Sequence, residues 1–100
     1  MKIVIQPSAL SDQRSGYRFY EKQESGLGAY FLDSLFSDID SLQLHAGIHR
    51  KHFGRFHRIL SERFPYAIYY EFDGASAQVR AVLDLRREPT FNERKVKKLD

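Results

Sequence analysis

The sequence predicts an α+β domain in which an N-terminal strand and an α-helical hairpin pack on a mainly antiparallel β-sheet, followed by a short C-terminal tail or helix. Three observations favour this class. Apolar residues recur at helical spacing in residues 27–42, two strand-like runs meet at a glycine turn in residues 65–85, and a short apolar run opens the chain. A length of 100 residues suits one core, so residues 1–100 are expected to form a single domain.

Residues 2–24 are expected to form a strand followed by a helix. The run KIVIQ at residues 2–6 has the composition of a short strand, which Pro7 ends. The hydroxyl group of Ser8 can then cap a helix that extends to about residue 24. Gly16 lies inside this helix at a cost of about 1 kcal/mol relative to alanine.

The second helix has the clearest amphipathic pattern in the chain. Ser25-Gly26 is a suitable end for the first helix, because glycine accepts the left-handed conformation that follows a last helical turn. The apolar stripe of the second helix consists of Leu27, Phe31, Leu35, Ile39 and Leu42, with Leu32 and Phe36 at its edges. The acidic residues expected to face away are Asp33, Asp38 and Asp40. So short a connection implies an antiparallel hairpin, whose apolar side needs the sheet as its partner.

The remaining strands are expected between residues 48 and 85. Residues 48–53 and 56–63 are predicted to be short strands, and residues 65–72 and 77–85 a longer antiparallel pair. Gly74 can take the positive φ that the turn of this pair needs.

The last strand and the C-terminal segment carry two further expectations. Along the strand, Val79, Ala81, Leu83 and Leu85 are expected on one face, and Gln78, Arg80, Val82 and Asp84 on the other. The segment after Pro89 is polar enough to be a frayed tail, or it forms a short helix capped by Thr90 or Asn92.

Composition narrows the class of protein. The chain lacks cysteine, which excludes disulfides and thiolate zinc sites. Its N-terminal apolar run is too short for a signal peptide, and no run approaches the length of a membrane span. We therefore expect a soluble cytoplasmic protein with no membrane partner and no cofactor.

Charge is distributed unevenly along the sequence. Residues 49–58 hold four basic side chains and no acidic one, and residues 86–98 hold six basic and two acidic ones. Such separation favours anionic partners on one side of the molecule. In the first segment the basic residues alternate with aromatic ones, so it could bind a nucleic acid or form a solvated sheet edge. The charge pattern alone does not separate a nucleic acid from an acidic protein.

The residues capable of chemistry form no recognisable catalytic or metal-binding motif. Gly47 interrupts the helix that would align His45 with His49, and no cysteine or nearby carboxylate completes a metal shell for these residues, His52 and His57. No metal site is expected, and the histidines are interpreted as solvated or phosphate-facing. The candidates for acid–base chemistry, which share no spacing motif, are Asp84, Glu71, Glu62 and His57.

The order of several short motifs resembles the ParE branch of the RelE/ParE toxin superfamily. The matching segments are Gly26-Leu27-Gly28, residues 63–70 (RFPYAIYY), residues 81–83 (AVL) and residues 86–89 (RREP), in the same order over nearly the whole chain. The resemblance implies the toxin of a bacterial type II toxin–antitoxin module, such as those that stabilise plasmids. It also implies a co-encoded antitoxin as partner.

The resemblance bears on the kind of activity as well. RelE-type members cleave messenger RNA on the ribosome with two arginines and a C-terminal tyrosine, and the matching positions here are Ala67, Leu85 and Phe91. These side chains cannot supply positive charge or acid–base chemistry. We therefore expect no enzyme but a protein that, like ParE-type members, poisons DNA gyrase. Two alternatives stay open: a ribosome-dependent RNA endonuclease with a relocated catalytic set, and a degenerate relative that only binds an antitoxin.

Two groups of residues are the expected contact sites. The predicted target-binding residues are Arg58, Arg86, Arg87, Arg94 and Lys95. The predicted antitoxin-binding residues are Tyr17, Tyr20, Phe31 and Leu35, on a helical stripe that a small sheet covers only in part.

Overall fold

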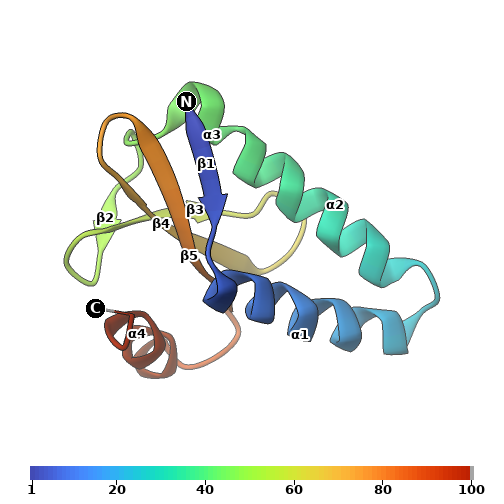
Figure 1. Cartoon of the computed structure of the whole chain (residues 1–100). Coiled ribbons are helices and arrows are strands. Elements are labelled where there is room, and N and C mark those ends of the chain that lie inside the picture. The colour runs from blue at the N-terminus through green and yellow to red at the C-terminus, as the bar shows by residue number, and fades with distance from the viewer. Residues whose placement is uncertain (100) are drawn as a thin grey trace.

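The computed structural model describes residues 1–99, and its helices and strands follow the expected order (Figure 1). They are β1 (Lys2–Ile5), α1 (Pro7–Gln23), α2 (Leu27–Asp40), α3 (Leu42–His45), β2 (Lys51–His52), β3 (Phe56–Leu60), β4 (Tyr66–Phe72), β5 (Ser76–Asp84) and α4 (Pro89–Lys97). The strands form one five-stranded sheet in the order β1-β5-β4-β3-β2. The β1–β5 pair is parallel and the other pairs are antiparallel. The predicted α+β class, with a helical hairpin on a mainly antiparallel sheet, is confirmed.

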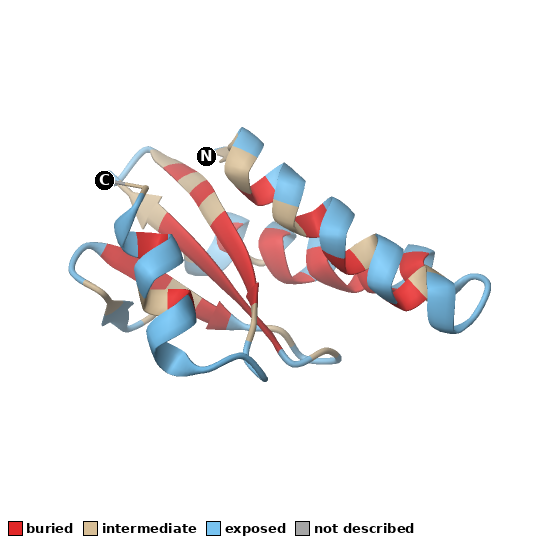
Figure 2. Cartoon of the chain, turned by 90° about the horizontal axis from the view of Figure 1, so that it is seen from below, coloured by how far each residue is buried: buried red, intermediate tan, exposed pale blue. Residues whose placement is uncertain are grey.

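The sheet separates two apolar clusters, with α1 and α2 on one of its faces and α4 on the other (Figure 1). The cluster under α1 and α2 includes the buried side chains of Phe31, Leu35, Ile68 and Tyr70. The cluster under α4 consists of Phe56, Ala67, Tyr69, Ala81, Leu83 and Val96. Buried positions alternate with exposed ones along each helix in Figure 2, as expected for helices that bury one apolar face.

Two predicted glycine turns are confirmed. Gly26, between α1 and α2, has a φ of 91°, and Gly74, between β4 and β5, has a φ of 94°. The carboxylate of Glu21 accepts hydrogen bonds from the N–H groups of Gly26 (3.1 Å) and Gly28 (2.9 Å). These bonds occupy backbone donors at the start of α2 that would otherwise lack a partner.

The start of α1 differs from the predicted cap. Gln6 is the N-cap residue and Pro7 occupies the first turn, where the missing N–H and fixed φ of proline suit a helix. Ser8 lies inside the helix, and its hydroxyl group donates to the backbone oxygen of Arg80 in β5 (2.6 Å). The predicted cap is therefore wrong, because Ser8 ties α1 to the sheet instead.

One acidic residue of α2 faces the interior of the protein. Asp33 and Asp40 are exposed as predicted, but Asp38 is buried. Its carboxylate accepts a hydrogen bond from Oγ of Ser61 (2.7 Å). Burial raises the pKa of Asp38, although this hydrogen bond and one from the backbone of Glu62 oppose the rise. The prediction that Asp38 faces away is wrong because the residues that follow β3 offer its carboxylate two donors.

A β-bulge interrupts the predicted pairing of β4 with β5. Tyr69 pairs with Ala81, but the next residue, Tyr70, pairs with Val79. Arg80 is therefore the extra residue, and the alternation of side chains along β5 shifts by one position there.

The bulge moves the apolar residues of β5 to both faces of the sheet. Val79 and Val82 pack in the cluster under α1 and α2, whereas Ala81 and Leu83 pack in the cluster under α4. Leu85 lies beyond the end of the strand and is exposed. The prediction of a single apolar face along this strand is therefore wrong, since it assumed unbroken alternation.

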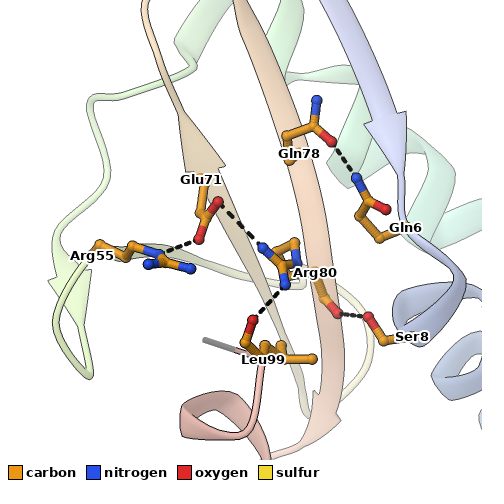
Figure 3. Close-up of polar contacts among 7 residues, drawn as sticks. All are labelled: Gln6, Ser8, Arg55, Glu71, Gln78, Arg80 and Leu99. Carbon is orange, nitrogen blue, oxygen red and sulfur yellow. Dashed lines mark hydrogen bonds and ion pairs between the residues drawn. The ribbon is translucent and has the colours of Figure 1, made fainter.

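Arg80 connects the bulge to the C-terminal helix (Figure 3). Its guanidinium donates to Oε2 of Glu71 on β4 (3.3 Å) and to the backbone oxygen of Leu99 (2.6 Å). Glu71 also pairs with Arg55. Together with the fully buried Val96, these contacts hold α4 over the sheet.

The C-terminal segment is a helix with a different cap from the predicted ones. Glu88 is its N-cap residue and Pro89 lies in its first turn, so Thr90 and Asn92 are both inside the helix. The side-chain amide of Asn92 donates to the backbone oxygen of Asp84 (2.9 Å). The alternative of a frayed tail is wrong because Val96 and Asn92 both bind the sheet.

Candidate target-binding cleft

Beyond the end of β1, β5 has no partner strand on that side, and side chains from α1 and α4 form hydrogen bonds with its backbone instead. The N–H group of Val82 donates to Oδ2 of Asp12 on α1 (2.9 Å). Two residues further along, the backbone oxygen of Asp84 accepts the hydrogen bond from Asn92 on α4. These bonds satisfy backbone groups that an edge strand leaves unpaired, and they fix α1 and α4 on either side of the end of β5.

A cleft of about 370 Å³ lies between these three elements. It is lined by Asp12, Ser15, Gly16 and Phe19 from α1, by Tyr66, Val82, Leu83 and Asp84 from the strands, and by Arg87, Phe91, Asn92 and Lys95 at the C-terminal side. Small-molecule sites in proteins begin at about this size. The cleft thus combines cations, carboxylates and aromatic rings within one hollow.

Two cations lie against the ring of Phe91 at the rim of the cleft. The guanidinium carbon of Arg87 is 4.8 Å from the ring centroid, and Nζ of Lys95 is 5.6 Å from it. Both distances are within the range of cation–π attraction. Phe91 is 40% exposed, so the ring and its two cations face solvent together.

Arg86 is held in place by several neighbours. Its Nε donates to Oδ1 of Asp84 (3.0 Å) and its Nη2 to Oδ2 of the same carboxylate (2.8 Å). Its guanidinium carbon lies 5.4 Å from the centroid of the Phe19 ring. Burial alone would raise the pKa of Asp84, but the side-chain and backbone hydrogen bonds from Arg86 outweigh it and hold the pKa below its ordinary value.

Burial also shifts the pKa values of two other side chains of the cleft, Asp12 and Tyr66. Burial raises the pKa of Asp12, although the hydrogen bond from Val82 and the charge of Lys95 oppose the rise. Burial, reinforced by the charge of Asp84, raises the pKa of Tyr66 to about 12. Tyr66 therefore keeps its hydroxyl proton at neutral pH.

The structure brings together only part of the predicted target-binding group. Arg87 and Lys95 line the cleft, and Arg86 is bound to Asp84, which also lines it. Arg94 is exposed on α4 outside it. Arg58 is on β3, and β4 lies between β3 and β5 in the sheet. Its backbone N–H donates to the backbone oxygen of Arg50, which precedes β2 at the far edge of the sheet.

Sequence reasoning did not identify Asp12 or Asn92 as residues of the candidate site. Asp12 was part of a helix with no expected partner, and Asn92 was predicted only as a cap. Both become site residues because the end of β5 has unpaired backbone groups after β1 stops, a consequence of strand lengths that no local pattern reveals.

His49 and His57 contact the side chain of Tyr70 instead of lying in the predicted solvated loop. Nδ1 of His49 lies 2.5 Å from the Tyr70 hydroxyl group, and the buried His57 ring stacks on the Tyr70 ring at a centroid distance of 5.0 Å. Nδ1 of His57 also lies 2.6 Å from the backbone oxygen of His49. The interpretation of these two histidines as solvated or phosphate-facing is therefore wrong.

Most of the predicted antitoxin-binding residues lie inside the protein. Phe31 and Leu35 are completely buried and Tyr20 is 6% exposed. They pack between the helices and the sheet, so the prediction that they contact an antitoxin is corrected. Tyr17 alone of the four reaches the outer side of the hairpin.

A second hollow follows the outer side of the helical hairpin. It has a volume of about 340 Å³ and is lined by Leu10, Gln13, Arg14, Tyr17, Arg18, Leu32 and Phe36. We refer to it as the hairpin groove. Leu10 and Phe36 are 37% and 48% exposed, which leaves apolar surface uncovered as the wide stripe predicted.

The three positions that correspond to RelE-type functional residues are in different surroundings. Ala67 is completely buried in the cluster under α4. Leu85 and Phe91 are 39% and 40% exposed.

Within residues 1–99, no group of three or more histidine, cysteine or carboxylate side chains is arranged to hold a metal ion. In the same part of the chain, no helix has the length and apolar character needed to cross a membrane.

Comparison with known proteins finds the same fold elsewhere. No protein-family model and no curated protein matches the sequence. A solved chain described as "Chromosomal ParDE TA system from P. aeruginosa" superposes with a TM-score of 0.71 at 15% sequence identity. The match covers 85% of this chain and 96% of that one. The chain therefore shares the fold of that ParDE chain, as the predicted architecture required.

Proposed function

We propose that this protein is the toxin of a bacterial type II toxin–antitoxin module and acts in the cytoplasm, where a co-encoded antitoxin neutralises it. The proposal is supported by the fold shared with a chain of a ParDE system over most of both chains. The uncovered hairpin groove provides a surface to which an antitoxin can bind.

The proposed mode of action is binding and poisoning of DNA gyrase without a catalysed reaction. The observation that carries this part is the position of α4. Val96 of α4 and Ala67 of β4 are both completely buried in one cluster, so this face of the sheet is covered where RelE-type toxins carry an arginine. An RNA phosphate has no access to that position, and no side chain there can stabilise a phosphoryl-transfer transition state.

The hairpin groove is the proposed antitoxin site. Its exposed apolar side chains, Leu10 and Phe36, suit the apolar face of a partner segment. Within residues 1–99, Nε2 of the buried Gln13, which also lines the groove, has no hydrogen-bond partner. A carbonyl group of the antitoxin can accept from this amide.

Two assays on the purified toxin test the target. In the first, purified gyrase supercoils a relaxed plasmid in the presence of the toxin, and in the second, translating ribosomes are incubated with the toxin and the transcript is examined for cleavage. We expect inhibition of supercoiling or accumulation of cleaved DNA complexes, intact transcripts, and reversal of the effect by the antitoxin.

The remaining outcomes separate the alternatives. Transcript cleavage without gyrase inhibition would overturn the proposal in favour of a relocated RNase site. A protein that binds the neighbouring gene's product but is inactive in both assays would be a degenerate relative.

A further inference from the structure

Asn92 lines the cleft between α1, β5 and α4, and its side-chain amide is buried there. The residue is 4% exposed, and its Nδ2 donates to the backbone of Asp84. Within residues 1–99, its Oδ1 has no hydrogen-bond partner. A buried acceptor without a donor is unfavourable, so an occupant of the cleft that places an N–H group against this oxygen is favoured.

Two further acceptor groups line the same cleft. Asp12 and Asp84 contribute carboxylates to the same cleft. Asp84 is bound to Arg86, whereas Asp12 binds only one backbone N–H group among the hydrogen bonds described, that of Val82. The inner part of the cleft therefore suits the donor-bearing edge of a ligand.

The rim of the cleft carries positive charge and the flat apolar ring of Phe91. Arg87 and Lys95 lie against the ring of Phe91, and neither forms an ion pair with a carboxylate of residues 1–99. Cations next to an exposed aromatic ring can bind a phosphate group while the ring stacks on a base.

We propose that this cleft binds one nucleotide whose base carries an exocyclic amino group. The base stacks on Phe91, its amino edge donates to Oδ1 of Asn92 and to the carboxylate of Asp12, and its phosphate group lies between Arg87 and Lys95. A volume of about 370 Å³ accommodates one such unit. The same chemistry is offered by a free nucleotide and by an unpaired base of a nucleic acid strand.

This inference does not depend on the proposed target. Nucleotide binding is measured on the isolated full-length protein, whereas gyrase poisoning needs the enzyme and its DNA. Either can therefore fail without the other.

The test is calorimetric titration of the full chain with GMP, UMP, guanosine and inorganic phosphate, and with a short single-stranded oligonucleotide of mixed sequence. We expect GMP to bind more tightly than UMP, because uracil lacks the amino group, and more tightly than guanosine or phosphate alone. Binding of the oligonucleotide but not of GMP would identify an unpaired base of a strand as the source. Absence of binding by both, or equal affinity for GMP and phosphate, would overturn the proposal.

Matched variants locate the site. Lys95→Gln should weaken GMP or oligonucleotide binding about fivefold or more, and Phe91→Ala by a similar or larger factor. Lys98→Gln removes the same charge from a lysine that follows α4 and does not line the cleft, and it should have a much smaller effect. Equal losses for Lys95→Gln and Lys98→Gln would mean general electrostatic attraction and would refute the cleft as the site, whether or not the Phe91 variant folds.

Discussion

Arg86 and Arg87 are neighbours in the sequence but differ in their surroundings. Arg86 binds the Asp84 carboxylate through two nitrogens and lies over the Phe19 ring. Arg87 contacts the exposed ring of Phe91 and forms no ion pair within residues 1–99. Because the guanidinium group of Arg86 is already bound to Asp84, we expect Arg87 to be the residue of this pair that contacts a target directly.

The structural role of Arg86 leads to a prediction on pH dependence. In Arg86→Gln, the pKa of Asp84 should rise, because the hydrogen bonds that lower it are lost while burial, which raises it, remains. A carboxyl group whose pKa is lowered by folding stabilises the protein above its unfolded-state pKa, and this contribution is lost as the pH falls through the folded-state pKa. The variant should therefore be less stable than the wild type at neutral pH, and the difference should shrink in strong acid to what the contact of Arg86 with Phe19 contributes. NMR titration of Asp84 and thermal unfolding at both pH values measure the two effects.

Arg87→Gln is the matched control for this prediction. Arg87 acts on Asp84 only through its charge, which comes after the effects of Arg86 in size, so the pKa of Asp84 should change less. A larger change in Arg87→Gln than in Arg86→Gln would contradict the anchoring role of Arg86.

At the scale of elements, α1 has three faces, of which one packs in the core, one lines the cleft and one lines the hairpin groove. Ala9, Gln13, Gly16 and Tyr20 are its buried residues. Asp12, Ser15 and Phe19 line the cleft, and Leu10, Arg14 and Tyr17 line the hairpin groove. The three faces follow from the helical spacing of three and four residues, so this helix connects the core with both candidate binding sites.

Gly16 lies where the ring of Phe31 from α2 packs directly against the backbone of α1. A Cβ atom at this position would lie 2.5 Å from the ring of Phe31, which is completely buried and in contact with the rings of Tyr20 and Tyr66. We expect Gly16→Ala to destabilise the protein by about 1–2 kcal/mol, because overpacking costs more than the gain of about 1 kcal/mol in helix propensity. Chemical denaturation measures the change. Ser11→Ala, at an exposed position of α1, should be neutral or slightly stabilising, and a stabilised Gly16→Ala variant would disprove the tight contact.

The sequence allowed most elements to be predicted because their patterns are local. The stripe from Leu27 to Leu42 matched α2, although its last residue starts the separate short helix α3, and the aromatic and β-branched runs on both sides of Gly74 matched β4 and β5. The bulge at Arg80 could not be predicted, because apolar residues such as Val79 and Ala81 fit either face of a strand when both faces of the sheet are buried. Only the pairing with Tyr69 and Tyr70, which is not local, decides between the two registers.

The candidate site was less predictable than the fold. Basic residues after β5 were visible as a charge run, but the sequence could not separate Arg86 from Arg87, since this depends on the distance to Asp84. The role of α4 was also hidden, because a polar segment with few apolar residues gives no strong helical signal. Val96 and the bond from Arg80 to Leu99 hold it on the sheet, and these are contacts between distant segments.

At the scale of the whole molecule, two open hollows lie on different faces of the same helix. The cleft faces α4 and the end of β5, and the hairpin groove faces away from the sheet between α1 and α2. A partner bound in the groove therefore leaves the rim residues Arg87 and Lys95 in place but can extend over α1 toward them. Neutralisation by an antitoxin then requires either that it covers the cleft or that it keeps the target away by its size.

This separation predicts that binding of the antitoxin and of the target can be disrupted independently. Phe36→Ser should weaken binding of the antitoxin encoded beside the gene by about tenfold or more, because Phe36 is an exposed aromatic side chain of the hairpin groove and such residues dominate the energy of interfaces. Phe19→Ser is the matched control, since Phe19 is exposed to nearly the same degree, 47% against 48%, but lines the cleft instead. Calorimetry with the purified antitoxin measures both affinities, and the supercoiling assay should show that Phe36→Ser keeps its activity on gyrase. An unchanged affinity in Phe36→Ser would place the antitoxin on another surface, and an equal loss in both variants would mean that the antitoxin covers the cleft as well, which would contradict independent disruption.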